Sequence, residues 1–552
     1  MRALEVAVVA AAAWLVTGFV TSITQAQVPA TVAPLRTQSG LVAGQVLPSG
    51  VKVWLGIPFA QPPTQSLRWR PPQPFQWQGV WNADRTMPEC IQVLRPHNIN
   101  HYFGEEPTSE NCLYLNIWAP AKSTEHSRLP VVVFIHGGGF TIGSSGSPLY
   151  AGEPLARHGV VFVNFNYRLG ILGFLAHPEL THEQGGHSGD YGFLDQVAAL
   201  KWIHENIARF GGDPSRVLIS GQSAGAGSVS AQIFSPLAKG LFQAAFLSSG
   251  CNWTGNGTPL AQAESTGLQV QKLLGAANLE AMRQVPADKL LALQAENQVM
   301  ASNPGVRVGP IIDGYFAPAA PQAILEAHGL NDVPIIATSN GQDLDTAMSP
   351  LVAAKTVAEY HDIATRLYGA DAPEFLRLYP VSRDEDVKEV ASRAARDGGM
   401  QGNARKCAQL QSRHASSSAY LSLFTHKHPY IPGVVIADQN TATIGAYHTA
   451  DIPYWFGTLD VFNLIRPTRD WQPWDHELAE DMMSTLVAFA KTGNPSTAAL
   501  RWPAWRTDDE KRVVFGERVG VESLDTQRMD WLAAHPAARP AAPGPGSAGP
   551  RD

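Results

Sequence analysis

Apolar runs that predict buried strands alternate along the chain with amphipathic segments that predict helices. Val131–Ile135 is apolar without interruption, which is typical of a strand buried on both faces of a parallel sheet. Farther along, apolar residues recur at helical spacing and predict an amphipathic helix ending at Gly211: Phe193, Val197, Leu200, Ile203, Ile207 and Phe210. This alternation favours an α/β fold with a large, mostly parallel sheet and helices on both faces.

Other segments belong to the same sheet or surround it. Further strands are expected at Leu113–Trp118, Val160–Asn166, Ala244–Ser248, Val333–Thr338 and Tyr420–Phe424. Alternating residues predict a small antiparallel hairpin over Thr37–Trp54, and the Pro-rich Gly56–Trp81 is expected to wrap irregularly over the surface. Two mainly helical segments, Ala261–Gln298 and Ala353–Gln411, are expected to build a cap, and Glu477–Lys491 is expected to be a late helix.

The two ends of the chain differ in composition from its middle. A basic residue precedes the apolar stretch Val6–Val20 and small residues follow it, which predicts a signal peptide over 1–26 with cleavage near Ala26-Gln27. An uncleaved membrane anchor is the alternative, but a membrane span needs roughly 20 apolar residues. The remainder is expected to form one domain over 27–535, exported to the periplasm or the medium, with a disordered tail over 536–552.

The overall composition is that of a large folded protein. The chain has 552 residues, of which 44% are hydrophobic, and its net charge of −7 without a basic run argues against nucleic acid as a partner. It contains no phosphate-binding loop, dinucleotide fingerprint or Cys/His metal-binding motif. Four cysteines in an exported chain favour disulfides: Cys90 is expected to pair with Cys112, whereas Cys251 and Cys407 either pair with each other or stay buried as free thiols.

The candidate chemistry is centred on Val217–Gly225, where an apolar run ends in Gly-x-Ser-x-Gly and small residues follow. A strand, a tight turn and a helix in this order place a serine, here Ser223, at a helix N-terminus that favours developing negative charge. Gly221 and Gly225 would leave room for the close approach of strand and helix. A Gly/Ser-rich turn without chemistry is the alternative, because short patterns of this kind recur by chance.

Four further motifs surround this segment: Ser109–Asn116, His136–Phe140, Asn166–Gly170 and Phe210–Pro214. With the elbow serine among them in family order, nearly the whole mature chain resembles the type-B carboxylesterase/lipase family of α/β-hydrolases. The resemblance implies an α/β-hydrolase fold with helical cap insertions, and a serine esterase that needs no metal and no organic cofactor. It also implies structural ion pairs of Arg68 with Glu110 and of Arg168 with Asp195.

The same resemblance assigns roles to individual residues. Gly445–Asp451 is similar to the family's histidine loop, so His448 is the expected base that takes the proton of Ser223. The expected oxyanion hole consists of three backbone N–H groups: Gly138, Gly139 and Ala224. His136, which precedes the glycines, is expected to be structural.

The triad acid is expected between the serine and the histidine in the chain. In the family, a Glu follows the strand that Val333–Thr338 resembles, and the matching residue here is Asp343, or Asp345 if the turn is longer. Asp313 looks like a turn aspartate. Because Asp is one methylene shorter than Glu, the acid loop must approach His448 more closely than in the family.

The predicted function is therefore hydrolysis of a small-molecule carboxylic ester through an acyl-enzyme on Ser223. A lipase acting on long-chain acyl esters and a non-catalytic, cholinesterase-like adhesion module are the alternatives. Ile436–Gly457 is most similar to bacterial members, which include fumonisin esterases that release tricarballylate. The sequence gives no basis for naming the natural ester or the oligomeric state.

One loop bears on that choice of substrate. Between Cys90 and Cys112 lie Arg95, His97 and His101, in a loop that forms one lip of the active-site entrance in the family. A mildly basic lip would suit esters whose acid part carries extra carboxylates. A solvated loop without a substrate role is the alternative.

Overall fold

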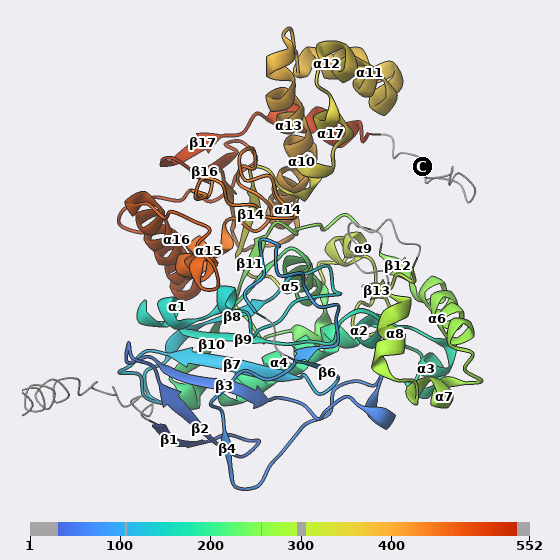
Figure 1. Cartoon of the computed structure of the whole chain (residues 1–552), viewed down its shortest axis with the longest axis vertical. Helices are drawn as coiled ribbons and strands as arrows, with labels where there is room; N and C mark the ends of the chain where they lie inside the picture. The colour runs from blue at the N-terminus through green and yellow to red at the C-terminus, as the bar shows by residue number, and fades with distance from the viewer. Residues whose placement is uncertain (1–30, 105–106, 256, 295–304, 538–552) are drawn as a thin grey trace, which may run out of the picture.

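The computed structural model describes residues 31–104, 107–255, 257–294 and 305–537 (Figure 1). The predicted signal peptide (1–26) and most of the predicted tail (536–552) lie outside the described residues. The described part of the chain is organised around a 13-stranded sheet with the order β1-β2-β3-β7-β9-β8-β10-β11-β14-β15-β16-β17, in which β4 pairs with β2.

The strands of this sheet are β1 (Thr31–Arg36), β2 (Leu41–Val46), β3 (Lys52–Pro58), β4 (Val80–Asn82), β7 (Tyr114–Ala119), β8 (Leu129–Ile135), β9 (Val161–Phe165), β10 (Gly212–Gln222), β11 (Ala244–Ser248), β14 (Ile335–Asn340), β15 (Ala419–Phe424), β16 (Lys511–Phe515) and β17 (Val519–Ser523). Two short pairs lie outside it: β5 (Glu89–Cys90) with β6 (Thr108–Ser109), and β12 (Thr258–Pro259) with β13 (Ile311–Ile312). Every pairing from β9 through β8 to β16 is parallel, and the antiparallel pairings lie toward the two edges. The expected large, mostly parallel sheet is thus confirmed.

The helices are α1 (Glu153–Arg157), α2 (Gly170–Phe174), α3 (Pro178–Glu183), α4 (Tyr191–Asn206), α5 (Ala224–Phe234), α6 (Leu260–Leu274), α7 (Leu279–Arg283), α8 (Ala287–Leu293), α9 (Pro321–Glu326), α10 (Leu344–Met348), α11 (Val357–Tyr368), α12 (Ala372–Leu378), α13 (Val387–Gly398), α14 (Met400–His414), α15 (Ile452–Phe456), α16 (Pro473–Thr492) and α17 (Thr526–Ala534). The predicted amphipathic helix is α4, which continues as a 3₁₀ turn to Phe210 before Gly211 ends it with φ 90°.

Two hydrophobic cores, one on each face of the sheet, explain the uninterrupted apolar runs. In β8, Val131, Val133 and Ile135 belong to the core shared with α4 and α5, whereas Val132 and Phe134 belong to the core shared with α16. Successive side chains of a strand point to opposite faces, so a strand covered on both sides must be apolar at every position.

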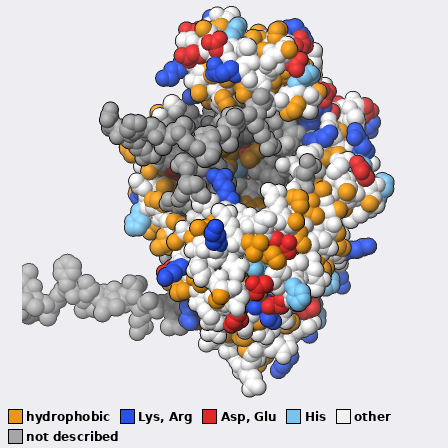
Figure 2. Space-filling model, turned by 90° about the vertical axis from the view of Figure 1, so that its right-hand side faces the viewer, with side chains coloured by type: hydrophobic (Ala, Val, Ile, Leu, Met, Phe, Trp, Pro, Cys, Tyr) orange, Lys and Arg blue, Asp and Glu red, His pale blue; other side chains and the backbone are white. Residues whose placement is uncertain are grey.

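The helical insertions were expected to form a cap, but the helices of Ala353–Gln411 divide between a separate lobe and the sheet. Helices α11 to α13 pack with α17 around a small core of their own, and they form the lobe at the top of Figure 1. Figure 2 shows the lobe again at the top of the molecule, with charged side chains of both signs on its surface. Helix α14, by contrast, packs on β14 and β15 and contributes Ala404, Cys407 and Ala408 to the core of the sheet. This helix covers the sheet and is not part of a cap.

A buried carboxyl connects α4 to the insertion between β11 and β14. Asp190 precedes α4, and its Oδ1 accepts a hydrogen bond from the backbone N–H of Ile311 at 3.2 Å. Its Oδ2 is buried and has no hydrogen-bond partner among the described residues. Burial, together with the nearby carboxylate of Asp313, raises the pKa of Asp190 well above its ordinary value. Asp190 is therefore protonated in the folded protein over a range of pH in which it is ionised in the unfolded chain.

We predict that Asp190→Asn stabilises the protein above about pH 4, the ordinary pKa of Asp. A carboxyl whose folded-state pKa is raised contributes stability below its unfolded-state pKa, and this stability is lost as pH rises through the folded-state pKa. The amide of Asn keeps the acceptor for Ile311 and cannot ionise. The melting temperature of the variant should exceed that of the wild type increasingly as pH rises, and should match it in acid.

Asp332 provides a control of opposite sign. Although burial raises the pKa of this carboxyl, hydrogen bonds from Ser416 and Ser417 lower it below the ordinary value. Asp332→Asn should therefore lower the melting temperature near neutral pH, and the difference should vanish as pH falls. A flat pH dependence of the difference between Asp190→Asn and wild type would contradict the assignment.

Candidate active site

Ser223 lies on the sharp turn between β10 and α5. Its backbone has φ 58° and ψ −125°, a conformation that costs a residue with a side chain on the order of 1–3 kcal/mol. A Cβ on Gly225 would lie 2.1 Å from the carbonyl oxygen of Ile135, and a Cβ on Gly221 would lie 2.2 Å from that of Gly225. Strand and helix thus meet backbone to backbone, as the Gly-x-Ser-x-Gly pattern predicts.

A line of hydrogen bonds runs from the turn to a buried carboxylate. The Oγ of Ser223 lies 2.8 Å from Nε2 of His448, and Nδ1 of His448 bonds directly to Oδ1 of Asp343. The carboxylate of Asp343 is buried, and its Oδ2 accepts hydrogen bonds from the hydroxyl of Ser249 (2.6 Å) and from the backbone N–H of Asn340 (3.0 Å). These bonds fix the position of the Asp343 carboxylate, which in turn holds the imidazole of His448 in one orientation.

The loop that carries Asp343 is bonded directly to the loop that carries the histidine. The N–H of Gln342 donates to the carbonyl of Ala446 at 2.8 Å, and Gln342 forms a parallel bridge with Tyr447. On the serine side, the amide of Gln222 donates to the carbonyl of His448 at 2.8 Å. The close approach that an aspartate requires is thus made by backbone hydrogen bonds between the two loops.

A second buried carboxylate, Asp451, is bonded to residues of the same loops. It accepts hydrogen bonds from the hydroxyl of Ser248 (2.7 Å), the amide of Asn340 (3.0 Å) and the indole of Trp455 (3.1 Å). Burial raises its pKa above the ordinary value. Asp451 lies within the histidine motif, but its role could not be predicted from the sequence, because its partners are as far away in the chain as Ser248 and leave no local pattern.

The glycine run after β8 passes beside the serine. A Cβ on Gly137 would lie 3.0 Å from the Cβ of Ser223, so the run and the elbow are in van der Waals contact. Gly138 and Gly139 have φ of 105° and 62°, which favours glycine. Ala224 is the first residue of α5. Ala224 thus follows the serine directly, and Gly138 and Gly139 follow the glycine that contacts it.

His136 has the structural surroundings that the sequence analysis expected. It is buried, its Nδ1 bonds to the carbonyl of Gly137 at 2.9 Å, and its ring stacks on Tyr167 at a centroid distance of 4.5 Å. Burial lowers its pKa to about 4, so the ring is neutral near pH 7.

Asp313, another candidate acid, is bonded within its own turn. Asp313 accepts hydrogen bonds from three backbone N–H groups of its own turn, those of Tyr315, Phe316 and Ala317. It is the turn aspartate that the sequence suggested. Asp345 lies in α10, and its side chain is outside the part of the chain that the structure describes.

The basic lip suggested by the sequence is not supported. The guanidinium of Arg95 pairs with Glu89 at 2.8 Å, which balances its charge. His101 is half-buried, and the desolvation of its ring, with the charge of Arg469, lowers its pKa to about 3. Its Nε2 bonds to the hydroxyl of Thr449 at 2.6 Å. The loop is therefore bound to the histidine loop and does not present a row of cations.

Two disulfides are present, Cys90–Cys112 and Cys251–Cys407, with Cα–Cα distances of 5.0 and 6.5 Å. The first closes the loop that carries His101. The second connects the segment after β11, next to the turn of the serine, with α14.

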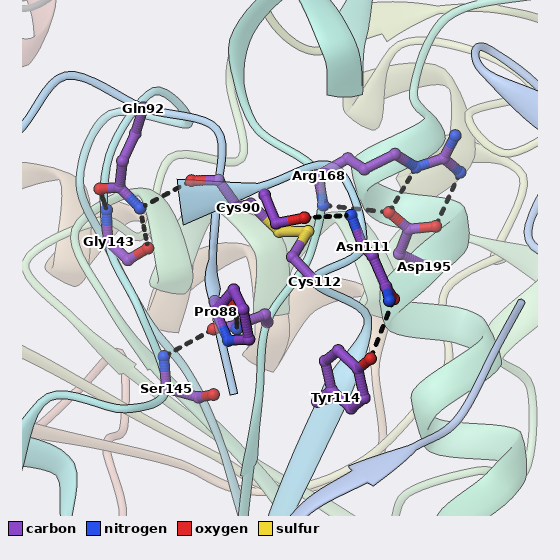
Figure 3. The surroundings of a disulfide bond; sticks show 12 residues. Pro88, Cys90, Gln92, Asn111, Cys112, Tyr114, Gly143, Ser145, Arg168 and Asp195 are labelled. Carbon is purple, nitrogen blue, oxygen red and sulfur yellow. Dashed lines mark hydrogen bonds and ion pairs between the residues drawn. A yellow bond between two sulfur atoms is a disulfide. The ribbon is translucent and has the colours of Figure 1, made fainter. Parts of the chain in front are cut away.

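Figure 3 shows how the first disulfide supports the glycine run. Next to it, the amide of Gln92 donates to the carbonyl of Gly143 at 2.9 Å and accepts from the N–H of Gly143 at 2.8 Å. A substituent on Gly143 would collide with the ring of His136, 2.3 Å away, so the loop is tightly held. Both expected ion pairs are confirmed, Arg68–Glu110 and Arg168–Asp195.

Comparison with known proteins agrees with this geometry. The sequence profile of the carboxylesterase family matches residues 31–530. The chain belongs to the carboxylesterase family. Among the relatives of this carboxylesterase, fumonisin B1 esterase of Sphingopyxis macrogoltabida is 36% identical over 499 residues, covering 88% of this chain and 86% of that protein. Para-nitrobenzyl esterase of Bacillus subtilis is 31% identical over 505 residues, covering 89% and 96%.

Solved structures show the fold. A PNB esterase structure superimposes with a TM-score of 0.71 at 31% identity, covering 90% of this chain and 99% of that chain. A carboxylesterase of Geobacillus stearothermophilus superimposes with a TM-score of 0.74 at 29% identity, covering 91% and 100%. The chain is therefore a carboxylic ester hydrolase with the α/β-hydrolase fold. None of its described helices is long and apolar enough to cross a membrane.

The packing of the elbow leads to a prediction for two glycines of α5. Gly225→Ala places a methyl group 2.1 Å from the backbone of β8, which cannot move without disturbing the sheet. Overpacking of this kind costs about 1–3 kcal/mol or more. We expect a lower free energy of unfolding by urea titration, and a loss of ester hydrolysis because the turn of Ser223 is displaced.

Gly227→Ala is the matched control in the same helix. Its methyl group would make an ordinary contact, 3.4 Å from the ring of Phe140. Since Ala exceeds Gly in helix propensity by about 1 kcal/mol, this variant should be as stable as the wild type or more stable. Equal stability of the two variants would contradict the packing argument.

Proposed function

We propose that this carboxylesterase hydrolyses esters with Ser223 as nucleophile, His448 as general base and Asp343 as the carboxylate that orients His448. The observation that supports the proposal is the line of hydrogen bonds from the serine hydroxyl through both ring nitrogens to the buried carboxylate. A serine hydroxyl is a weak nucleophile unless an adjacent base takes its proton, and the base needs a partner that fixes its tautomer.

The reaction follows from this arrangement. The Oγ of Ser223 attacks the ester carbonyl carbon while Nε2 of His448 takes the hydroxyl proton. The backbone N–H groups of Gly138, Gly139 and Ala224 would stabilise the oxyanion of the tetrahedral intermediate. When the intermediate collapses, the C–O bond to the alcohol breaks and the alkoxide takes the proton from the imidazolium. Water, deprotonated by His448, then attacks the acyl-enzyme. The bond between the acyl carbon and Oγ of Ser223 breaks, Oγ takes the proton back from the imidazolium, and the carboxylic acid leaves.

Export is part of the proposal. Disulfides form and persist mainly in oxidising compartments, and the described part of this chain contains two of them with every cysteine paired. Cleavage of a signal peptide near Ala26-Gln27 stays a prediction from the sequence.

The triad assignment predicts distinct effects of two substitutions. Ser223→Ala should abolish covalent labelling by an organophosphate and, as for triad serines generally, reduce kcat for a p-nitrophenyl ester by about 10⁶-fold. Asp343→Asn preserves the size of the side chain but favours the wrong tautomer of His448, and should reduce kcat by about 10⁴-fold. Both effects are measured by steady-state hydrolysis and by mass spectrometry of the labelled protein.

Asp345→Asn is the control, since the sequence left Asp345 open as the acid. It should keep kcat within a few-fold of the wild-type value. Labelling that persists in Ser223→Ala would exclude the serine as the nucleophile. A large loss of rate in Asp345→Asn with little loss in Asp343→Asn would move the acid to position 345.

For the substrate, we propose a bulky ester whose acid part is a polycarboxylate such as tricarballylate. The support is the similarity to fumonisin B1 esterase, which extends over 88% of this chain. The balanced charge of Arg95 means that any recognition of the extra carboxylates must come from elsewhere in the site.

A pair of synthetic esters tests this substrate class. A tricarballylate monoester and a butyrate ester of the same long-chain alcohol differ mainly in acyl charge. We expect kcat/KM to be higher for the tricarballylate ester, with release of tricarballylate measured by chromatography and with Ser223→Ala as the blank. Hydrolysis of the butyrate ester without release of tricarballylate would exclude the polycarboxylate class and leave the esterase assignment intact.

A further inference from the structure

A single buried histidine is bonded to the histidine loop on both sides of His448. The side chain of His428 is 1% exposed, and its Nε2 donates to the carbonyl of Ala450 at 2.8 Å. Its Nδ1 accepts a hydrogen bond from the hydroxyl of Tyr447 at 3.1 Å. Tyr447 and Ala450, which lie on either side of His448 in the chain, are therefore both bonded to the ring of His428.

These two bonds require a neutral ring. Nδ1 can accept from Tyr447 only when it carries no proton, while Nε2 must carry one to donate to Ala450. Doubly protonated imidazolium has no acceptor. The ring must therefore stay in one tautomer over the working pH range.

The surroundings of His428 favour this neutral form. Burial first, and then the guanidinium of Arg469, hold the pKa of His428 well below its usual range. The carbonyl of Ala450 and the carboxylate of Asp475 act in the opposite direction, and His426 adds to the lowering. The other side chains against the ring are aromatic: Tyr430, Tyr447, Tyr454, Phe462 and Trp471.

The cation beside His428 is itself fixed. The side chain of Arg469 is buried, and its Nε lies 3.4 Å from Nδ1 of His428. The guanidinium carbon lies 3.9 Å from the ring centre of Tyr430 and 4.6 Å from that of Phe462, within the range of cation–π contacts. Its Nη2 donates to the side-chain oxygen of Asn100, in the loop closed by the first disulfide. Arg469 therefore connects His428 to the loop closed by Cys90 and Cys112.

We propose that His428 is a positioning residue for the reaction: by bonding Tyr447 and Ala450 at once, it sets where the ring of His448 stands relative to Ser223. It does not touch the reacting atoms. The inference rests on the proposed roles of Ser223 and His448. A displacement of a catalytic group by about 1 Å can reduce the rate about 10²-fold. Because His428 is bonded to residues on both sides of His448, a change of His428 is expected to displace the imidazole of His448.

Substitution of His428 tests the proposal. His428→Phe keeps a planar ring among the aromatic neighbours and removes both hydrogen bonds. We expect kcat for a p-nitrophenyl ester to fall about 10- to 100-fold with KM changed much less, because the loss falls on proton transfer and not on binding. His428→Gln retains a donor for Ala450 and should recover part of the rate.

Tyr447→Phe keeps the test decisive if His428→Phe does not fold, because it removes a single hydroxyl. It should lower kcat several-fold, and in the double variant with His428→Phe the two losses should not add, since both remove the same bond. His177→Phe is the matched control: this buried histidine caps α3 and bonds to Gln271, away from the site. It should affect thermal stability and leave kcat of the folded enzyme unchanged.

Crystal structures of the His428 variants separate this inference from the proposed function. The Ser223–His448 distance of 2.8 Å should lengthen, or the ring of His448 should turn, in His428→Phe. An unmoved ring with an unchanged kcat overturns the inference. If the wild type neither hydrolyses esters nor takes up an organophosphate, the proposed function fails, whereas a displaced His448 ring still supports the positional role of His428.

Discussion

The close approach of backbones at the elbow is the constraint on which the rest of the active site depends. β8, the turn of Ser223 and α5 are so near one another that Gly221 and Gly225 have no space for a Cβ. The turn therefore holds the serine in a rarely adopted conformation, and Gly137 brings the glycine run into contact with it. The strain is tolerated because the surrounding strands are buried on both faces and cannot yield locally.

The parallel strands bring the remaining groups to the same edge. β10, β11, β14 and β15 are neighbours, and Ser223, Ser249, Asp343 and His428 each follow the carboxyl end of one of them. In open parallel sheets the loops after the carboxyl ends of the strands form the binding site. The segments that carry the candidate triad are distant in the chain, but they meet because the topology places the ends of their strands side by side.

Local patterns were sufficient for the parts of the site that depend on short-range structure. The apolar runs gave the strands, because each strand is covered on both faces, and the spacing of glycines around Ser223 gave the elbow. Neither the network around Asp451 nor the role of His428 could be found in this way. Their bonds join segments of unrelated sequence, and a buried polar side chain has the same local appearance as an exposed one.

The same limit explains two expectations that the structure changed. The lip was expected to be basic because only the residues between the two cysteines were considered. Glu89, which precedes Cys90, pairs with Arg95 in the folded protein. Helix α14 was grouped with the cap because helical periodicity shows which face is apolar and not what covers it. In both cases the missing information was the partner, which tertiary structure alone supplies.

The use of an aspartate as the candidate acid makes the site depend on how the histidine loop is held, and therefore on His428. An aspartate can reach His448 only if the two loops are held together, and here the bridge between Gln342 and Tyr447 holds them. That bridge fixes one side of the histidine loop, and Ala450 on the other side is bonded to His428. A buried polar group that keeps all its partners stiffens its surroundings, whereas one that loses a partner leaves an unsatisfied group behind. The geometry of the candidate triad thus depends as much on neutral His428 as on the acid that touches His448, because the acid orients the ring and His428 locates the backbone that carries it.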